Sequence, residues 1–157
     1  MVEIRQNVLR PLPALLQRCG SSLRSSLDAI VPHLASHLVD SDYCVRALAA
    51  KSLFQLLSVV RSAVAIPALL DRSVLGKSVR VREAVLTLLA HAVKERIPPP
   101  GEELPLAISR ELAPLTKLID DSISAVPLAA LAVLQQVHAC RVASLRALLG
   151  PAAAAAG

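Results

Sequence analysis

Two histidines with the spacing of metal ligands are the first residues whose types could support chemistry. His33 and His37 lie four residues apart, so they would share one face of a helix and could hold a zinc ion there. A zinc site needs a third protein ligand, and none lies near this pair in the sequence; no glutamate follows His33 as an HExxH motif requires. We interpret both histidines as helix-surface residues and predict no metal site.

Two short stretches resemble fragments of catalytic motifs but lack the residues that those motifs need. The Gly-Lys-Ser of 76–78 matches the end of a phosphate-binding loop, yet Asp71 replaces the upstream glycine and no strand-like segment precedes it. Gly20 precedes two serines without the second glycine of a nucleophile elbow. The sequence therefore predicts a protein that is not an enzyme and that uses no cofactor.

The three cysteines also give no chemical site. Cys19, Cys44 and Cys140 are an odd number spread over the chain without a CxxC pair, which is untypical of a disulfide framework or a zinc site. Cysteines without such a role are usually small buried apolar residues. We predict free, buried thiols in a reducing compartment such as the cytoplasm.

The composition indicates which elements must position the remaining residues. Of 157 residues, 29 are Leu and 26 are Ala, which favour helices, whereas only five are Gly and 1% are aromatic. Sheets need more β-branched and aromatic residues, and a disordered chain would have far fewer than 54% hydrophobic residues. We predict an all-α protein with one continuous core.

Charge and hydropathy exclude two kinds of partner. The formal net charge is +5, but the basic residues form no dense tract and one Tyr and one Phe offer no stacking platform, so we predict no nucleic-acid binding. The stretch 122–140 has no charged residue, but its unbroken apolar run covers only 125–134, which is shorter than the roughly 20 residues of a membrane span. We predict a buried core helix there and no membrane contact.

The sequence contains an internal repeat. Each copy has a turn-forming residue five positions before a valine, and apolar residues follow eight and eleven positions after that valine, on one face of a helix. The valines Val45, Val81 and Val126 are 36 and 45 residues apart. The segments that align at the start of the three copies are 40–49, 76–85 and 121–130.

The repeat predicts pairs of helices joined by tight turns. An amphipathic stretch precedes each copy, at 27–39, 63–75 and 104–119. A weaker copy that starts at Ile4 predicts an N-terminal half-repeat, whose helix Pro11 and Pro13 must kink or shorten. The expected fold is therefore about three helix pairs plus this half-repeat in one domain, 1–150. The alanine-rich tail, 151–157, is expected to be disordered.

The start of the second helix in each pair resembles the HEAT repeat, in which Asp, Val, Arg and Ala recur at fixed spacing. The first copy carries this pattern as Asp40, Val45, Arg46 and Ala49. The resemblance covers about 2–149, and it is shared with armadillo repeats. It implies a short right-handed α-solenoid that acts as a non-catalytic protein-interaction scaffold.

Within this class, residues 78–89 look like the middle of TOG and CLASP-type domains, which bind tubulin through their intra-repeat turns. This resemblance implies a cytoplasmic protein of the cytoskeleton or cilium, although the chain lacks the Trp usual on the first turn and has about half the length. It implies a protein partner, with tubulin as the specific candidate. The corresponding contact residues are Asp42, Tyr43, Lys77, Arg80, Ser122 and Ser124.

Two further interpretations concern structure and assembly. Arg46 and Arg82 are expected to hydrogen-bond Asp40 or Asp121 in a ladder between repeats. The alternative to tubulin binding is that the chain is a structural solenoid fragment, which we expect to join a larger assembly through its apolar last repeat. The residues expected at that interface are Leu128, Leu131 and Leu134.

Overall fold

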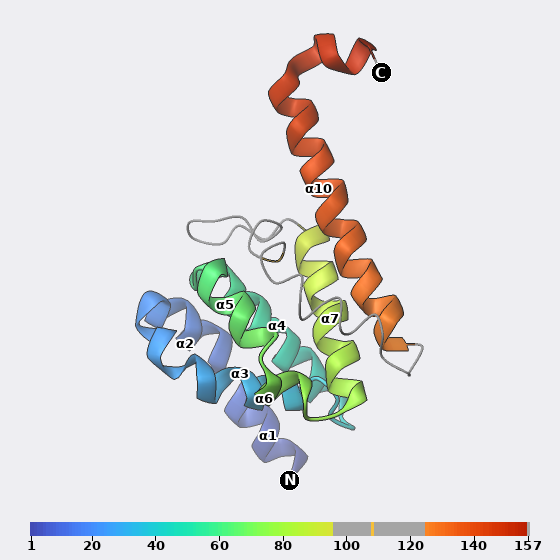
Figure 1. Ribbon diagram of the computed structural model, residues 1–157. Coiled ribbons are helices and arrows are strands. Elements are labelled where there is room, and N and C mark those ends of the chain that lie inside the picture. Colours follow the sequence, from blue (N-terminus) through green and yellow to red (C-terminus); the bar gives the residue numbers. More distant parts are fainter. Residues whose placement is uncertain (96–107, 109–124, 157) are drawn as a thin grey trace.

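The computed structural model describes residues 1–95, 108 and 125–156, and in this part of the chain it contains helices and no strand (Figure 1). The all-α prediction is thus confirmed for these residues. The elements follow in the order α1 (Val2–Leu9), α2 (Leu12–Cys19), the 3-10 helix η1 (Gly20–Ser26), α3 (Leu27–His37), α4 (Tyr43–Val59), α5 (Ser62–Leu69), α6 (Arg72–Leu75), α7 (Val79–Lys94) and α10 (Ala125–Ala156).

The N-terminal segment is divided into two short helices, as its prolines predict. Helix α1 ends at Leu9 and α2 begins at Leu12. Pro11 has no N–H to continue the hydrogen bonding of α1, whereas Pro13 lies in the first turn of α2, where a helix tolerates proline. Together these helices correspond to the predicted half-repeat.

Two of the predicted helix pairs lie within the described residues. The stretch 27–39 forms α3, and the stretch 63–75 forms α5 and α6. The second helix of each pair begins with a side-chain cap: Asp42 accepts from the N–H of Val45 at 2.9 Å, and Ser78 accepts from the N–H of Val81 at 3.2 Å. The predicted helix at 104–119 lies outside the described residues, except for the buried Ile108.

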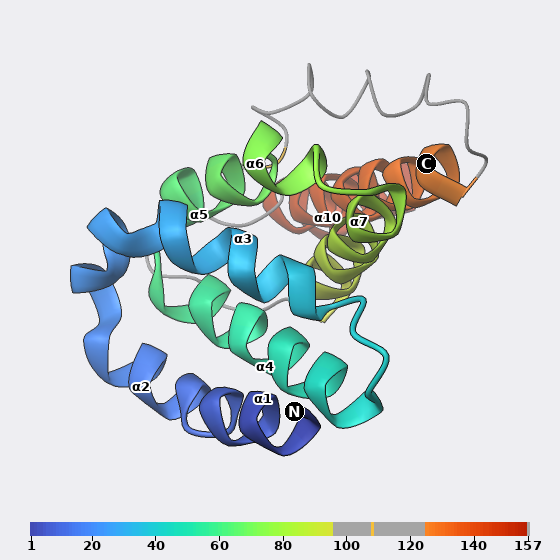
Figure 2. The same cartoon turned by 90° about the horizontal axis from the view of Figure 1, so that it is seen from below.

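The core is built from leucine, valine and alanine, as the composition suggests. Helix α4 packs against α1 and α2 on one side and against α3 on the other, and α3 also contacts α5, α6 and α7 (Figure 2). Helix α10 packs along α7 (Figure 1). Fully buried side chains occur throughout these contacts, among them Leu16, Leu53, Leu57, Ile66, Leu86 and Leu89.

Helix α10 is covered along one side only. Val126, Ala130, Val133 and Val137 are buried, and their spacing places them on a single face, towards α7. Among the described helices, α10 alone is long and apolar enough to cross a membrane, by length and composition, and only 22% of the window Val126–Ala143 is buried. The prediction of a buried core helix therefore applies to one face, because α7 is the helix along which α10 packs within the described residues.

Helix α10 contains a break near its end. The helix is interrupted at Gly150, whose φ of 73° and ψ of −176° are not helical, and helical backbone resumes to Ala156. Alanine has the highest intrinsic helix propensity, which favours helical backbone in 151–156. The disorder expected for 151–157 stays a prediction.

Candidate functional site

The turns between paired helices lie side by side at one end of the molecule (Figures 1 and 2). The Nζ of Lys77, between α6 and α7, donates to the Oγ of Ser36 near the end of α3 at 2.8 Å. This contact joins the second turn to the helix that leads into the first. We call the residues 38–43 and 76–80 the turn ridge.

Asp40 is the centre of the first turn. Its carboxylate lies against the guanidinium of Arg5 on α1, with Nε 3.1 Å from Oδ2 and Nη2 donating to Oδ1 at 3.2 Å. The N–H of Asp42 also donates to Oδ1, at 2.9 Å, and the Nδ1 of His37 lies 3.7 Å from Oδ2. This ion pair and its hydrogen bond from Nη2 to Oδ1 attach α1 to the turn.

Asp42 makes the second connection to α1. Besides capping α4, its Oδ1 accepts from the Nε2 of Gln6 at 3.0 Å. Its carboxylate is therefore engaged inside the molecule, although the resemblance to TOG and CLASP-type domains implies that Asp42 contacts a partner. Arg5 and Gln6 are not among the predicted site residues. The match of Ile4-Arg5 to Val45-Arg46 in the repeat is the signal in the sequence that points to Arg5.

These hydrogen bonds favour the ionised carboxylates. The N–H of Asp42 is the largest influence on Asp40 and, together with Arg5 and His37, it lowers the pKa of Asp40 below its ordinary value of 3.8. The N–H of Val45 and the amide of Gln6 lower the pKa of Asp42 in the same way. On α6, the N–H and hydroxyl of Ser73 lower the pKa of the capping Asp71.

We expect stability to fall in acid because of these three carboxylates. A carboxyl whose pKa is lower in the folded state stabilises that state at every pH above its unfolded pKa, and this stabilisation is lost as the pH falls through the folded pKa. The melting temperature should thus stay level from neutral pH to about pH 5 and fall below it. The decrease in melting temperature on acidification should be smaller in Asp40→Asn than in the wild type. In the control Glu83→Gln, at an exposed position of α7, the decrease should equal that of the wild type. Equal acid profiles for Asp40→Asn and wild type would contradict this assignment.

Arg46 and Arg82 occupy equivalent positions, each four residues after the cap of its helix. The Nη1 of Arg46 donates to the backbone carbonyls of Asp40 at 2.7 Å and Ser41 at 2.9 Å. The Nη1 of Arg82 donates to the carbonyl of Leu75, the last residue of α6, at 3.0 Å. Each arginine thereby closes the turn of its own helix pair.

The predicted hydrogen bond of Arg46 to Asp40 is present, but it is made within one helix pair and not between repeats. Arg46 binds the backbone carbonyl of Asp40, while the carboxylate of Asp40 is bound by Arg5, 35 residues away. Arg46 binds these backbone carbonyls because they belong to the turn of its own helix pair. Asp121, the other acidic residue of the predicted ladder, lies outside the described residues.

Three side chains of the turn ridge project into solvent. Tyr43 is exposed, and the guanidinium carbon of Arg46 lies 5.7 Å from the centre of the Tyr43 ring. Lys77 and Arg80 are exposed as well. Arg80 makes no hydrogen bond or ion pair with the described part of the chain, and Lys77 is held only through its contact with Ser36. Ser122 and Ser124, the remaining predicted contact residues, lie outside that part.

The predicted assembly residues on α10 fall into two groups. Leu128 and Leu131 are exposed, whereas Leu134 is partly buried and packs against the core. Leu128 and Leu131 thus face solvent on α10, as does Leu149 further along the helix. The same segment includes Cys140, whose Sγ donates to the carbonyl of Val93 at 3.9 Å.

The cysteines are free, but their burial differs from the prediction. Cys19 and Cys44 are exposed and Cys140 is partly buried. Cys19 ends α2 and Cys44 lies in the first turn of α4, and side chains at helix ends are covered by fewer neighbours.

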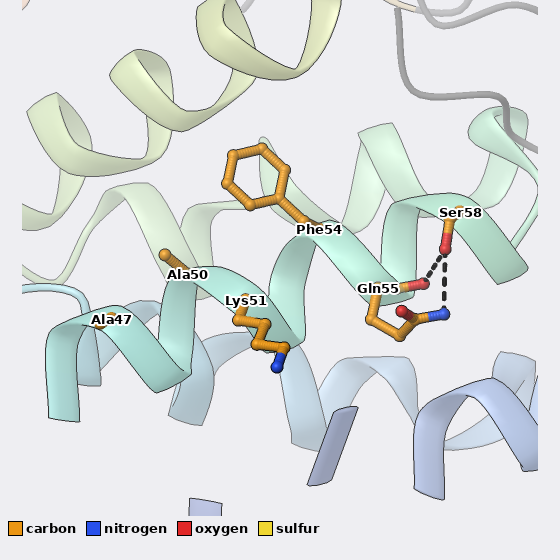
Figure 3. Close-up of a pocket in the computed structure, with 6 residues that line it drawn as sticks. All are labelled: Ala47, Ala50, Lys51, Phe54, Gln55 and Ser58. Atoms are coloured by element: carbon orange, nitrogen blue, oxygen red, sulfur yellow. Dashed lines mark hydrogen bonds between the residues drawn. The ribbon is translucent and has the colours of Figure 1, made fainter. Parts of the chain in front are cut away.

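In residues 1–95, 108 and 125–156, no group of three or more His, Cys, Asp and Glu side chains is arranged so that it could hold a metal ion. A shallow hollow of about 480 Å³ runs along α4, and Lys51 is the one charged residue among the described residues that line it (Figure 3). The side chains of Phe54 and Lys51 diverge there from neighbouring positions of the helix, and the ring of Phe54 meets His91 edge-on at 5.5 Å.

Comparison with known proteins leaves the geometry as the main guide to function. No model of a known protein family matches the chain, and no curated protein matches its sequence.

Proposed function

We propose that the chain is a non-catalytic interaction scaffold that binds a protein partner through the turn ridge. One observation carries the proposal: Tyr43, Lys77 and Arg80 stand exposed on turns that are ordered by internal contacts, such as those of Asp40 and Arg46. A surface of this kind is ordered before binding, so less conformational entropy is lost when a partner binds.

The proposed architecture is a right-handed HEAT-like α-solenoid. It is supported by the two equivalent helix pairs, in which the capping residue, the buried valine and the turn-closing arginine recur at the same spacing. Stacked helix pairs of this kind present a ridge of turns and an extended surface, which suits binding by shape and charge.

The proposed partner is an acidic protein surface, with tubulin as the specific candidate. The net charge of +5 and the two exposed cations of the ridge favour such a surface electrostatically. The resemblance of 78–89 to TOG and CLASP-type domains supports tubulin in particular and, with it, a cytoplasmic location at the cytoskeleton or cilium.

Reversing the charge of the ridge should abolish this binding. We expect the wild-type protein to pellet with stabilised microtubules and to co-elute with free tubulin in gel filtration. Lys77→Glu/Arg80→Glu should weaken binding at least about tenfold, because attraction to an acidic surface becomes repulsion. Absence of binding by the wild type would contradict the proposal of a tubulin partner.

A matched variant distinguishes binding through the turn ridge from attraction by the net charge alone. Arg61→Glu/Lys94→Glu makes the same change in charge at exposed positions beside the ends of α4 and α7 that are remote from the ridge. This variant should retain most of the wild-type binding. Equal losses in the two variants would show that binding follows overall charge and does not use the ridge.

A second candidate function is assembly through α10, and the exposure of Leu128 and Leu131 favours it. In this case the chain is a structural fragment of a larger complex and makes no direct contact with tubulin. Wild-type protein should then self-associate at micromolar concentration in analytical ultracentrifugation, and Leu128→Asp/Leu131→Asp should be monomeric. A monomeric wild type would contradict assembly with itself through this face.

A further inference from the structure

The outer face of α1 and α2 is apolar and exposed. Ile4 is 61% exposed, Val8 is 65% exposed and Leu15 is 50% exposed. Their spacing of four and seven residues follows one side of the segment, continued from α1 into α2. Three large apolar side chains in a row on a short segment indicate a surface that is covered in the working protein.

The same positions are buried in every later copy of the repeat. Ile4, Val8 and Leu15 occupy the first, fifth and twelfth positions counted from the valine position of the repeat. In α4, α7 and α10 the residues at these positions are at most 5% exposed. These residues are Val45, Ala49 and Leu56 in α4, Val81, Val85 and Ala92 in α7, and Val126, Ala130 and Val137 in α10.

The difference follows from the neighbouring helices. Helix α4 packs against α3 and against α1 and α2, and the equivalent face of α10 packs along α7. On the side of α1 and α2 that faces away from α4, Figure 2 shows no helix among the described residues. The face of Ile4, Val8 and Leu15 is therefore open in the described part of the chain, and an amphipathic helix has the shape to cover it.

The charges around this face favour an acidic occupant. Arg18 lies three residues after Leu15, on the same side of α2, and Arg10 and Arg24 are exposed in the same N-terminal part of the chain. None of the three makes an ion pair with the described part of the chain, and Glu3 is the single acidic residue of α1 and α2.

A second copy of this chain is a poorer match. The most exposed apolar helix, α10, contains no acidic residue and carries Arg141 and Arg146. Placing it on α1 and α2 would bring basic groups towards Arg10 and Arg18, which is unfavourable.

We propose that α1 and α2 bind one short amphipathic α-helix of a partner protein, which docks its apolar face on Ile4, Val8 and Leu15 and places acidic residues near Arg18. This inference rests on the proposed role as an interaction scaffold, but it uses a surface separate from the turn ridge.

The binding can be tested with a defined probe. A fluorescein-labelled peptide carries the sequence of 26–38, which includes α3, preceded by three glutamates; a control peptide carries three lysines instead. Fluorescence anisotropy should show saturable binding of the acidic peptide to the full chain and at least about tenfold weaker binding of the basic one. Absence of saturable binding by the acidic peptide would overturn the proposal.

Variants locate the peptide on the molecule. Ile4→Gln/Val8→Gln changes exposed side chains while keeping helix propensity, and it should weaken peptide binding at least about tenfold with an unchanged melting temperature. Arg10→Glu/Arg18→Glu should also weaken it, whereas Leu128→Gln, at an exposed position of α10, should bind as wild type does. Binding that is indifferent to Ile4→Gln/Val8→Gln would place the peptide elsewhere and contradict the proposal.

Two further outcomes separate this proposal from its alternatives. A wild-type dimer that Ile4→Gln/Val8→Gln converts to monomer would assign the face to a second copy and overturn the proposal. The ridge variant Lys77→Glu/Arg80→Glu should bind the acidic peptide as wild type does. Peptide binding without microtubule binding would therefore remove the tubulin proposal and support this one.

Discussion

Leu53→Ala lowers the free energy of unfolding by about 2–5 kcal/mol, since it opens a cavity at the centre of α4. Leu53 is fully buried, and α4 is the helix that α1, α2 and α3 all contact. Domains of this size are stable by about 5–15 kcal/mol, so the loss is a large share of the total. Urea denaturation followed by far-UV circular dichroism measures this loss. The midpoint should move to a lower urea concentration, while the dependence of the unfolding free energy on urea stays the same.

The matched control for this variant is Leu15→Ala. Leu15 lies on α2 and is half exposed, so its truncation removes little buried surface and leaves a smaller cavity. We expect a loss well below that of Leu53→Ala. Similar losses in the two variants would mean that α4 is not the centre of the core.

Ala130→Arg separates α10 from α7. Ala130 is fully buried on the face of α10 that packs along α7, and its small side chain allows the two helices to approach closely. A long charged side chain there has to force the helices apart or be buried without a partner, and both are strongly destabilising. Hydrogen–deuterium exchange should show loss of amide protection in Val126–Ala143, while α3 and α4 remain protected.

Gln135→Arg is the control for Ala130→Arg. Gln135 is exposed on the same helix, so an arginine at this position extends into solvent. Protection of α10 should equal that of the wild type. Retained protection in Ala130→Arg would show that the contact between α7 and α10 does not depend on close approach at Ala130.

The helices could be predicted from the sequence where local chemistry determines them. The starts of α4 and α7 follow from Asp42 and Ser78, which satisfy free N–H groups of their own helices, and the break after α1 follows from Pro11. Each of these effects acts within a few residues of the chain. The packed face of α10 also follows from the apolar spacing after Val126.

The candidate site could be predicted only in part, because its contacts join distant segments. Lys77, Arg80 and Tyr43 follow from the positions of the turns, and the structure places them in solvent. The pairing of Asp40 with Arg5 depends on how α1 docks on the first turn, and no local pattern specifies that arrangement. The exposure of Cys19 and Cys44 likewise depends on which helices lie nearby.

The contacts of the turn ridge also bear on how quickly the chain folds. The side-chain contacts of Asp40 with Arg5, Asp42 with Gln6 and Ser36 with Lys77 join residues 35, 36 and 41 positions apart. Helical proteins whose contacts stay within neighbouring segments close only short loops on the way to the native state and fold in microseconds to milliseconds. Refolding can therefore begin at either helix pair and spread to the adjacent one, without waiting for the two ends of the chain to meet.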